Sequence, residues 1–164
     1  MLRHLTQATS EYRGGSKALL EFNHAQQHSN NAITLYLRGL THLEQAIIHC
    51  DLAVGLSHAI ACCLVRDTPK DHFKFGENTP EERLRFLSNA IKHFNRTVVE
   101  GKLTDCTLPV WMVTEGLKSI FEPKKGETPI VKVLQFRELA DILGELASNA
   151  KFFAEDVYRI ASER

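Results

Sequence analysis

The chain has 164 residues, of which 43% are hydrophobic and 24% charged, with 20 basic and 20 acidic side chains. That length suits one domain able to bury a core without disulfides, and the ordinary composition argues against disorder. The balanced charge argues against a broad basic surface for duplex DNA, although a local basic face stays open. We therefore expect a single domain over residues 1–164.

The cysteines and the apolar runs bear on location. No C-x-x-C pair is present and three of the four cysteines share one apolar run, so we expect reduced thiols packed as small hydrophobes. Residues 1–10 lack the apolar core of a signal peptide, and the uninterrupted apolar stretch near 60–65 is far shorter than the ~20 residues of a membrane span. These features predict a cytoplasmic protein without membrane contact. The cysteines are Cys50, Cys62, Cys63 and Cys106.

Residues 1–15 predict a weakly ordered arm or short helix that ends at the glycine pair 14–15. Ser16 then suits the N-cap of a helix that starts at Lys17. The polar stretch 28–31 favours a kink or short loop, the alternative being the exposed turn of one continuous helix.

A long helix is predicted over residues 32–65. Its apolar residues recur at three- and four-residue spacing, which places them on one side of a helix that turns ~100° per residue. Pro69 ends the run, because proline disfavours helix just before itself. The expected buried stripe comprises Tyr36, Leu40, Leu43, Ile47, Cys50, Val54 and Ala61.

The next helix is predicted over residues 80–100, with sharp ends. Thr79 suits the N-cap, Pro80 the first helical position and Glu82 the closing position of a capping box. Gly101 is a natural C-terminal stop. The expected buried stripe comprises Leu84, Leu87, Ile91, Phe94 and Val98.

Residues 102–128 are the least regular part of the sequence, and 110–121 fit either a small β-hairpin or one short helix. A final helix is predicted over 130–162. The expected fold is all-α: an up-and-down bundle of four or five helices, with a hairpin or irregular segment near 110–121. The last helix's apolar face comprises Phe136, Leu139, Leu143, Leu146, Ala150, Phe153, Val157 and Ile160.

A polar stripe lies opposite the apolar one on the helix predicted over 80–100. Arg85, Asn89 and His93 are four residues apart and Arg96 follows, so their side chains are neighbours along one line. A neutral histidine can exchange a proton near pH 7, and arginines on either side can hold a phosphate. Asn89 could orient a ribose or the imidazole. General acid–base cleavage of RNA needs little more, because the 2′-hydroxyl supplies the nucleophile. The alternative is an ordinary solvated helix face.

The string at 87–94, Leu-Ser-Asn-Ala-Ile-Lys-His-Phe, resembles the R-N-x-x-x-H element of HEPN (higher eukaryotes and prokaryotes nucleotide-binding) domains. His93 matches the family histidine and Asn89 the polar residue after the arginine. Ser88 occupies the arginine's position, which departs from the family pattern. Arg85 and Arg96 are candidates for the missing charge, although the pattern does not include them.

The resemblance implies a helical bundle that acts as a metal-independent ribonuclease in bacterial toxin–antitoxin or abortive-infection systems, with no cofactor. It also implies RNA as the partner and a homodimer in which two such elements form one composite site. The other function that stays open is a non-catalytic interaction module, in which the polar stripe binds a protein partner or meets water.

A second stripe of Arg and His is predicted on the helix over 32–65. Arg38, His42, Gln45 and His49 share its non-core side, so the two stripes could meet within the chain or across a dimer.

Other histidines suggest competing sites. His24 and His28 are one turn apart, a spacing that can hold a transition metal. No Glu-x-x-His pair supplies further ligands from a facing helix, so we expect no metal site. His58 lies two turns from Asp51, and we expect a hydrogen-bonded core histidine rather than a ligand.

Overall fold

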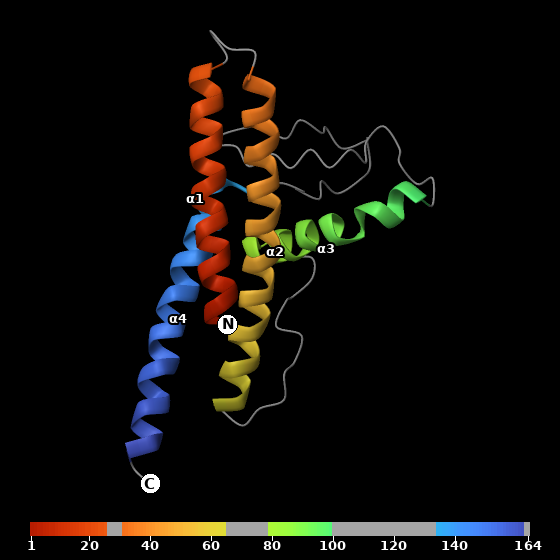
Figure 1. Ribbon diagram of the computed structural model, residues 1–164. Helices are drawn as coiled ribbons and strands as arrows, with labels where there is room; N and C mark the ends of the chain where they lie inside the picture. Colours follow the sequence, from red (N-terminus) through yellow and green to blue (C-terminus); the bar gives the residue numbers. More distant parts are fainter. Residues whose placement is uncertain (26–30, 65–78, 100–133, 163–164) are drawn as a thin grey trace.

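The computed structural model describes residues 1–25, 31–64, 79–99 and 134–162, and these contain four helices and no strand. The all-α class is therefore confirmed for the described part of the chain (Figure 1). The stretch 110–121, Pro69, Gly101 and Cys106 lie outside it. The helices are α1 (Leu2–Ala25), α2 (Ala32–Leu64), α3 (Pro80–Val99) and α4 (Phe136–Ser162).

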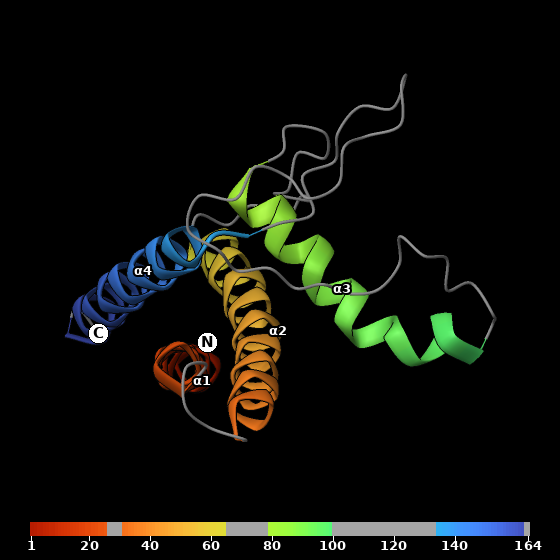
Figure 2. The same ribbon diagram turned by 90° about the horizontal axis from the view of Figure 1, so that it is seen from above.

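Helices α1 and α2 lie antiparallel and side by side (Figures 1 and 2). Glycines permit their close approach. A Cβ added at Gly15 would lie 2.9 Å from Leu43 Cγ, and one at Gly39 would lie 2.8 Å from Leu19 Cδ2. Both distances are shorter than a normal carbon–carbon contact, so the two backbones meet where side chains are absent.

The prediction that a short first helix ends at the glycine pair is therefore wrong. Helix α1 runs through Gly14 and Gly15, and Ser16 and Lys17 are interior helical positions rather than a cap and a start. The gain from packing α1 against α2 outweighs the ~1 kcal/mol that glycine costs in a helix relative to alanine. The predicted kink or short loop at 28–31 lies outside the described residues except for Asn31, which directly precedes the start of α2 at Ala32.

Helix α2 contacts each of the other three helices and supplies much of the core. Leu43, Ile47, Cys50 and Val54 of the predicted stripe are buried. Tyr36 and Leu40 are only partly buried, and Ala61 is exposed, which corrects the two ends of that stripe. At the Ala61 end, α2 extends past the start of α1 (Figure 1). At the other end it packs only against the last turns of α1 among the described helices, where the rings of Tyr36 and Phe22 lie 5.2 Å apart.

The cysteines of α2 also differ in burial. Cys50 and Cys62 are buried free thiols, as expected, but Cys63 is exposed. Burial, reinforced by the negative charge of Asp51, raises the pKa of Cys50 to about 12, so this thiol stays protonated and packs as a small apolar group.

Helix α2 is also long and apolar enough to cross a membrane by length and composition, a test that the core helix of a soluble protein passes as well. The interrupted apolar pattern of the sequence did not reveal this. The cytoplasmic location therefore stays a prediction.

Helix α3 crosses α2 at a steep angle rather than running beside it (Figures 1 and 2). Its start is as predicted: Pro80 is the first helical residue, and the Glu82 amide donates to Thr79 Oγ1 at 3.2 Å. Leu84 and Leu87 are buried, as expected, and Ile91 packs against the core. The side chains of residues 94–99 lie outside the described part.

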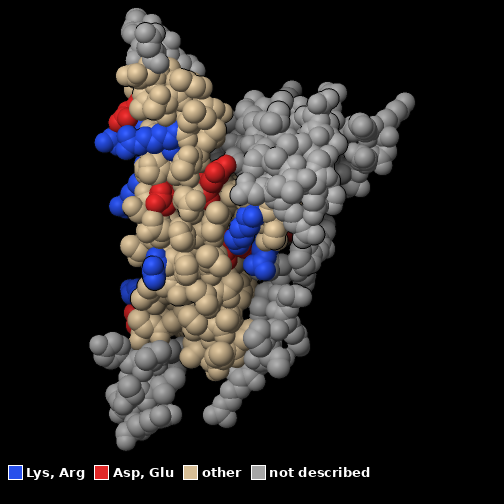
Figure 3. All heavy atoms as spheres, turned by 45° about the vertical axis from the view of Figure 1, so that its right-hand side comes forward, with Lys and Arg blue, Asp and Glu red and all other residues tan. Residues whose placement is uncertain are grey.

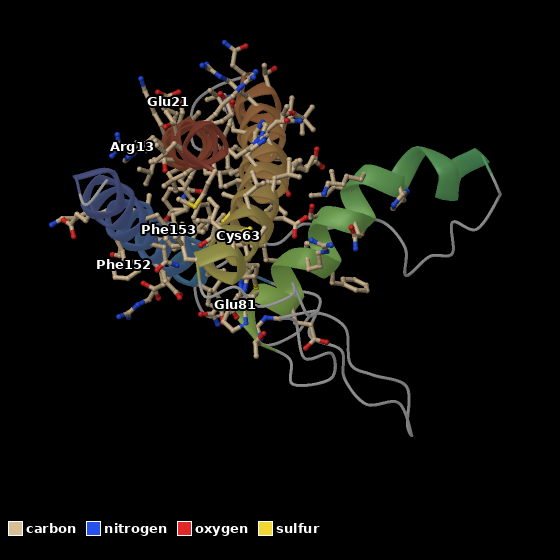
Figure 4. The ribbon with its side chains drawn as sticks, turned by 90° about the horizontal axis from the view of Figure 1, so that it is seen from below. Arg13, Glu21, Cys63, Glu81, Phe152 and Phe153 are labelled. Carbon is tan, nitrogen blue, oxygen red and sulfur yellow. The ribbon has the colours of Figure 1, made fainter. Side chains whose placement is uncertain are left out.

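Helix α4 begins at Phe136, later than the predicted start at residue 130. Glu138 caps it, because its Oε2 accepts from the Gln135 amide at 2.9 Å. Leu139, Leu143 and Leu146 are buried as predicted. Viewed from below, side chains fill the space between α1, α2 and α4, whereas Phe152 lies on the outer side of α4 (Figure 4).

Candidate functional site

A buried carboxylate joins α2 to α3. Asp51 is 1% exposed and lies in the middle of the apolar helix α2. Its Oδ2 accepts from Ser88 Oγ at 2.8 Å and from Lys92 Nζ at 3.0 Å, and its Oδ1 accepts from Arg85 Nη1 at 3.2 Å. We call these four residues the Asp51 cluster.

Helical geometry explains why one carboxylate meets three side chains of α3. Arg85, Ser88 and Lys92 are three and four residues apart, so they lie within an arc of ~60° on one face of the helix. Leu84 and Leu87, on the adjoining arc, are buried in the core and hold that face against α2. The packing of the apolar stripe thereby brings the polar face to Asp51.

The side chains of the Asp51 cluster differ in their exposure to solvent. Ser88 is fully buried, whereas the side chains of Arg85 and Lys92 are 42% and 32% exposed. The four residues of the cluster together carry two cations and one carboxylate. The carboxylate is compensated inside the protein, while the cations reach solvent, where they can meet an anion.

The predicted site residues are divided by this arrangement. Arg85 belongs to the Asp51 cluster, and Asn89 and His93 are exposed on the same helix. At ~100° per residue, Asn89 follows Arg85 around α3 by ~40° and His93 follows by ~80°. The side chain of Arg96 lies outside the described residues.

The position of the family arginine is informative. Ser88 faces α2 and donates to Asp51 rather than facing solvent. In this chain the motif's first position is therefore part of the interface between two helices, and Arg85 is the described cation one helical turn before Asn89.

Within one molecule the two histidines of the second Arg/His stripe do not meet the first stripe, and a meeting across a dimer stays a prediction. His42 and His49 face α1: His42 Nδ1 lies 2.6 Å from Glu11 Oε2, and His49 Nδ1 lies 3.1 Å from His4 Nδ1. Arg38 and Gln45 are exposed. The two histidines are thus separated from Arg38 and Gln45, because α1 covers the edge of the stripe that holds the histidines, and this edge faces away from α3.

Burial lowers the pKa of His49, and the neighbouring His4 and Arg3 lower it further, against an opposing effect of Glu11. His24 is exposed, and His28 lies outside the described part. Within the described ranges, no group of three or more His, Cys, Asp or Glu side chains is placed to hold a metal ion. His58 is partly buried, and its core hydrogen bond stays a prediction.

The sequence analysis missed Lys92 and the role of Asp51. Two signals were present. An acidic residue interrupts the apolar run of α2, and such a residue needs partners when the helix is buried. Lys92 also lies seven residues after Arg85, which is two turns along the same face. Neither signal identifies the partner of Asp51, because the partner depends on how α3 packs against α2.

No family model, curated protein or solved structure matches this chain.

Proposed function

We propose that this chain binds RNA through the outer face of α3 and cleaves it with His93 as a proton-transfer group. The observation that carries the proposal is the adjacency, on one helix, of exposed Asn89 and His93 to two cations gathered on a buried carboxylate. Arg85 and Lys92 bind the phosphodiester, and Asn89 orients the ribose or the imidazole. The HEPN-like string at 87–94 supports the same assignment.

The proposed reaction uses only groups of the RNA and of the protein. His93 accepts the proton of the 2′-hydroxyl, the 2′-oxygen attacks the adjacent phosphorus, and the bond to the 5′-oxygen breaks. A second acid returns a proton to the 5′-oxygen, and in a homodimer the partner copy supplies it through its own His93. The products are a 2′,3′-cyclic phosphate and a 5′-hydroxyl, and no metal takes part.

The test is incubation of purified protein with single-stranded RNA and with tRNA in the presence of a chelator, followed by analysis of the product ends. We expect wild type to cleave, His93→Ala to lose at least a hundredfold in rate, and exposed His24→Ala on α1 to match wild type. Cleavage that persists in His93→Ala removes His93 from the mechanism. Wild type that neither binds nor cleaves RNA rules the proposal out.

The cellular setting implied by the resemblance, bacterial defence or toxin–antitoxin, gives a second readout. Induced expression in a bacterial host should arrest growth for wild type and for His24→Ala but not for His93→Ala. Equal arrest by all three would show that toxicity does not depend on the α3 site.

A second candidate function is a non-catalytic interaction module with a protein partner, a second copy included. Large apolar side chains are exposed on both helices of the α2–α3 pair: Leu52 at 38%, Leu56 at 40% and Phe86 at 40%. Figure 3 shows a largely uncharged described surface on this side of the molecule. The measurement that separates the candidates is oligomeric state for wild type and Leu56→Glu, alongside RNA binding. Loss of self-association in Leu56→Glu with no RNA binding by wild type would favour this second function.

A further inference from the structure

The buried charge of Asp51 is not explained by stability alone. Taking an ion pair out of water costs several kcal/mol per ion before its partners compensate, and well-packed apolar residues often replace such pairs without loss. Asp51 is nevertheless 1% exposed in a helix whose other buried side chains are uncharged. Its partners are three residues of the helix that also presents Asn89 and His93.

The carboxylate divides its two oxygens between the two cations. Oδ1 accepts from Arg85, and Oδ2 accepts from Lys92 and from the buried Ser88 hydroxyl. The Ser88 bond fixes the carboxylate, because both of its groups are buried and neither can turn to water. Arg85 and Lys92 are two turns apart, roughly 10 Å along the helix axis, with Asn89 between them in sequence.

We propose that Asp51 is a positioning residue for RNA: its fixed carboxylate holds Arg85 and Lys92 beside the exposed face of α3, so that one phosphate-bearing strand meets both cations next to Asn89 and His93. This inference rests on the proposed function. The ligand it specifies is a phosphodiester, since the groups of the cluster that reach solvent are two cations, while Asp51 is buried and bonds to these cations and to Ser88.

If Asp51 positions the cations, Asp51→Asn should change the affinity for RNA in the opposite direction from the change expected if Asp51 only balances charge. Asp51→Asn keeps the shape and a hydrogen-bond acceptor for Ser88 but removes one negative charge. If Asp51 only neutralised its neighbours, this change would raise the affinity for RNA, because the site would become more positive. If Asp51 positions the cations, the same change releases two flexible side chains and lowers the affinity, and we expect roughly tenfold.

The experiment measures the dissociation constant of a fluorescent oligouridylate at several salt concentrations for wild type, Asp51→Asn, Arg85→Gln, Lys92→Gln and the double variants with Asp51→Asn. The matched control is Asp141→Asn, which removes an exposed carboxylate of α4. We expect Arg85→Gln to weaken binding in the wild-type background but by less than twofold in the Asp51→Asn background. Each lost phosphate contact should also lower the salt slope by about 0.7.

The outcomes separate the two proposals. Wild type that does not bind the oligonucleotide overturns both the proposed function and this inference. Binding that depends on Arg85 and Lys92 but is equal or tighter in Asp51→Asn overturns only the positioning role. Fully additive losses in the double variants do the same, because the part of the effect of Asp51 that acts through one cation must disappear once that cation is removed. Amide hydrogen exchange across α3 identifies any variant whose helix has unfolded, and Asp51→Ala, which adds no volume to the buried site, then provides the second measurement of affinity.

Discussion

His4 and His49 face each other across the α1–α2 contact through their Nδ1 atoms, 3.1 Å apart. The ring centroids are 5.3 Å apart, so the two nitrogen atoms are near the closest points of the rings. A hydrogen bond in this geometry needs one proton between two nitrogen atoms, since each Nδ1 either donates or accepts. A proton on both would set two N–H groups against each other.

This pair predicts a loss of stability on acidification. The pKa of His49 is lowered in the folded state, chiefly by burial and then by His4, so the unfolded chain takes up a proton first as the pH falls. Stability is complete above the unfolded pKa of ~6.5 and declines as the pH falls below it. We expect the urea midpoint to decrease from pH 7.5 to 5.5, and His49→Gln to reduce that decrease. His24→Gln, which changes an exposed histidine of α1, should leave it unaltered; a slope identical in all three proteins would contradict the assignment.

Glycines of two kinds are distinguished by what surrounds them. Gly15→Ala places a Cβ 2.9 Å from Leu43 Cγ and 3.3 Å from the Gly39 carbonyl oxygen, so overpacking exceeds the helix-propensity gain. We expect the free energy of unfolding to fall by about 1–2 kcal/mol. Gly144→Ala meets nothing within 4 Å and should raise it by about 0.5–1 kcal/mol. Urea denaturation of both variants measures this, and a stabilising Gly15→Ala would show that α1 and α2 are not in close contact there.

The Ser88 hydroxyl makes a buried bond to a charged acceptor. Ser88→Ala removes the 2.8 Å bond to Asp51 and should lower the free energy of unfolding by about 2 kcal/mol. Ser148→Ala is the control: its hydroxyl bonds to the Gly144 carbonyl on the exposed face of α4, and alanine favours helix, so the change should be within about 0.5 kcal/mol. Equal effects of the two substitutions in chemical denaturation would mean that the two cations alone satisfy the carboxylate.

The cysteines of α2 should differ sharply in reactivity. Cys63 is exposed, whereas Cys50 is buried and its pKa is raised to about 12, so little thiolate forms at neutral pH. Native protein treated with iodoacetamide at pH 8 should be alkylated at Cys63 and not at Cys50, as read by peptide mass mapping. Both should react in denaturant. Alkylation of Cys50 in the native protein at the rate of Cys63 would show that α2 is not packed as described.

The sequence alone was enough to predict the all-α class of the described residues and the start of α3, because both depend on local chemistry. Thr79-Pro80 starts α3 because a hydroxyl cap and a residue without an amide proton suit the first turn, and this needs no information from the rest of the chain. The buried positions Leu43, Ile47, Leu84 and Leu139 follow from the helical period in the same way.

Only tertiary packing decided where α1 ends and which partners the polar side chains of α2 meet. The glycine pair at 14–15 does not end α1, because the close approach of α2 compensates for its weak helix propensity. Asp51 links α2 to α3 inside the protein, and His42 and His49 of α2 face α1, on the side away from α3. The helical period says which residues share a face, but the partner of each face depends on contacts between residues far apart in sequence.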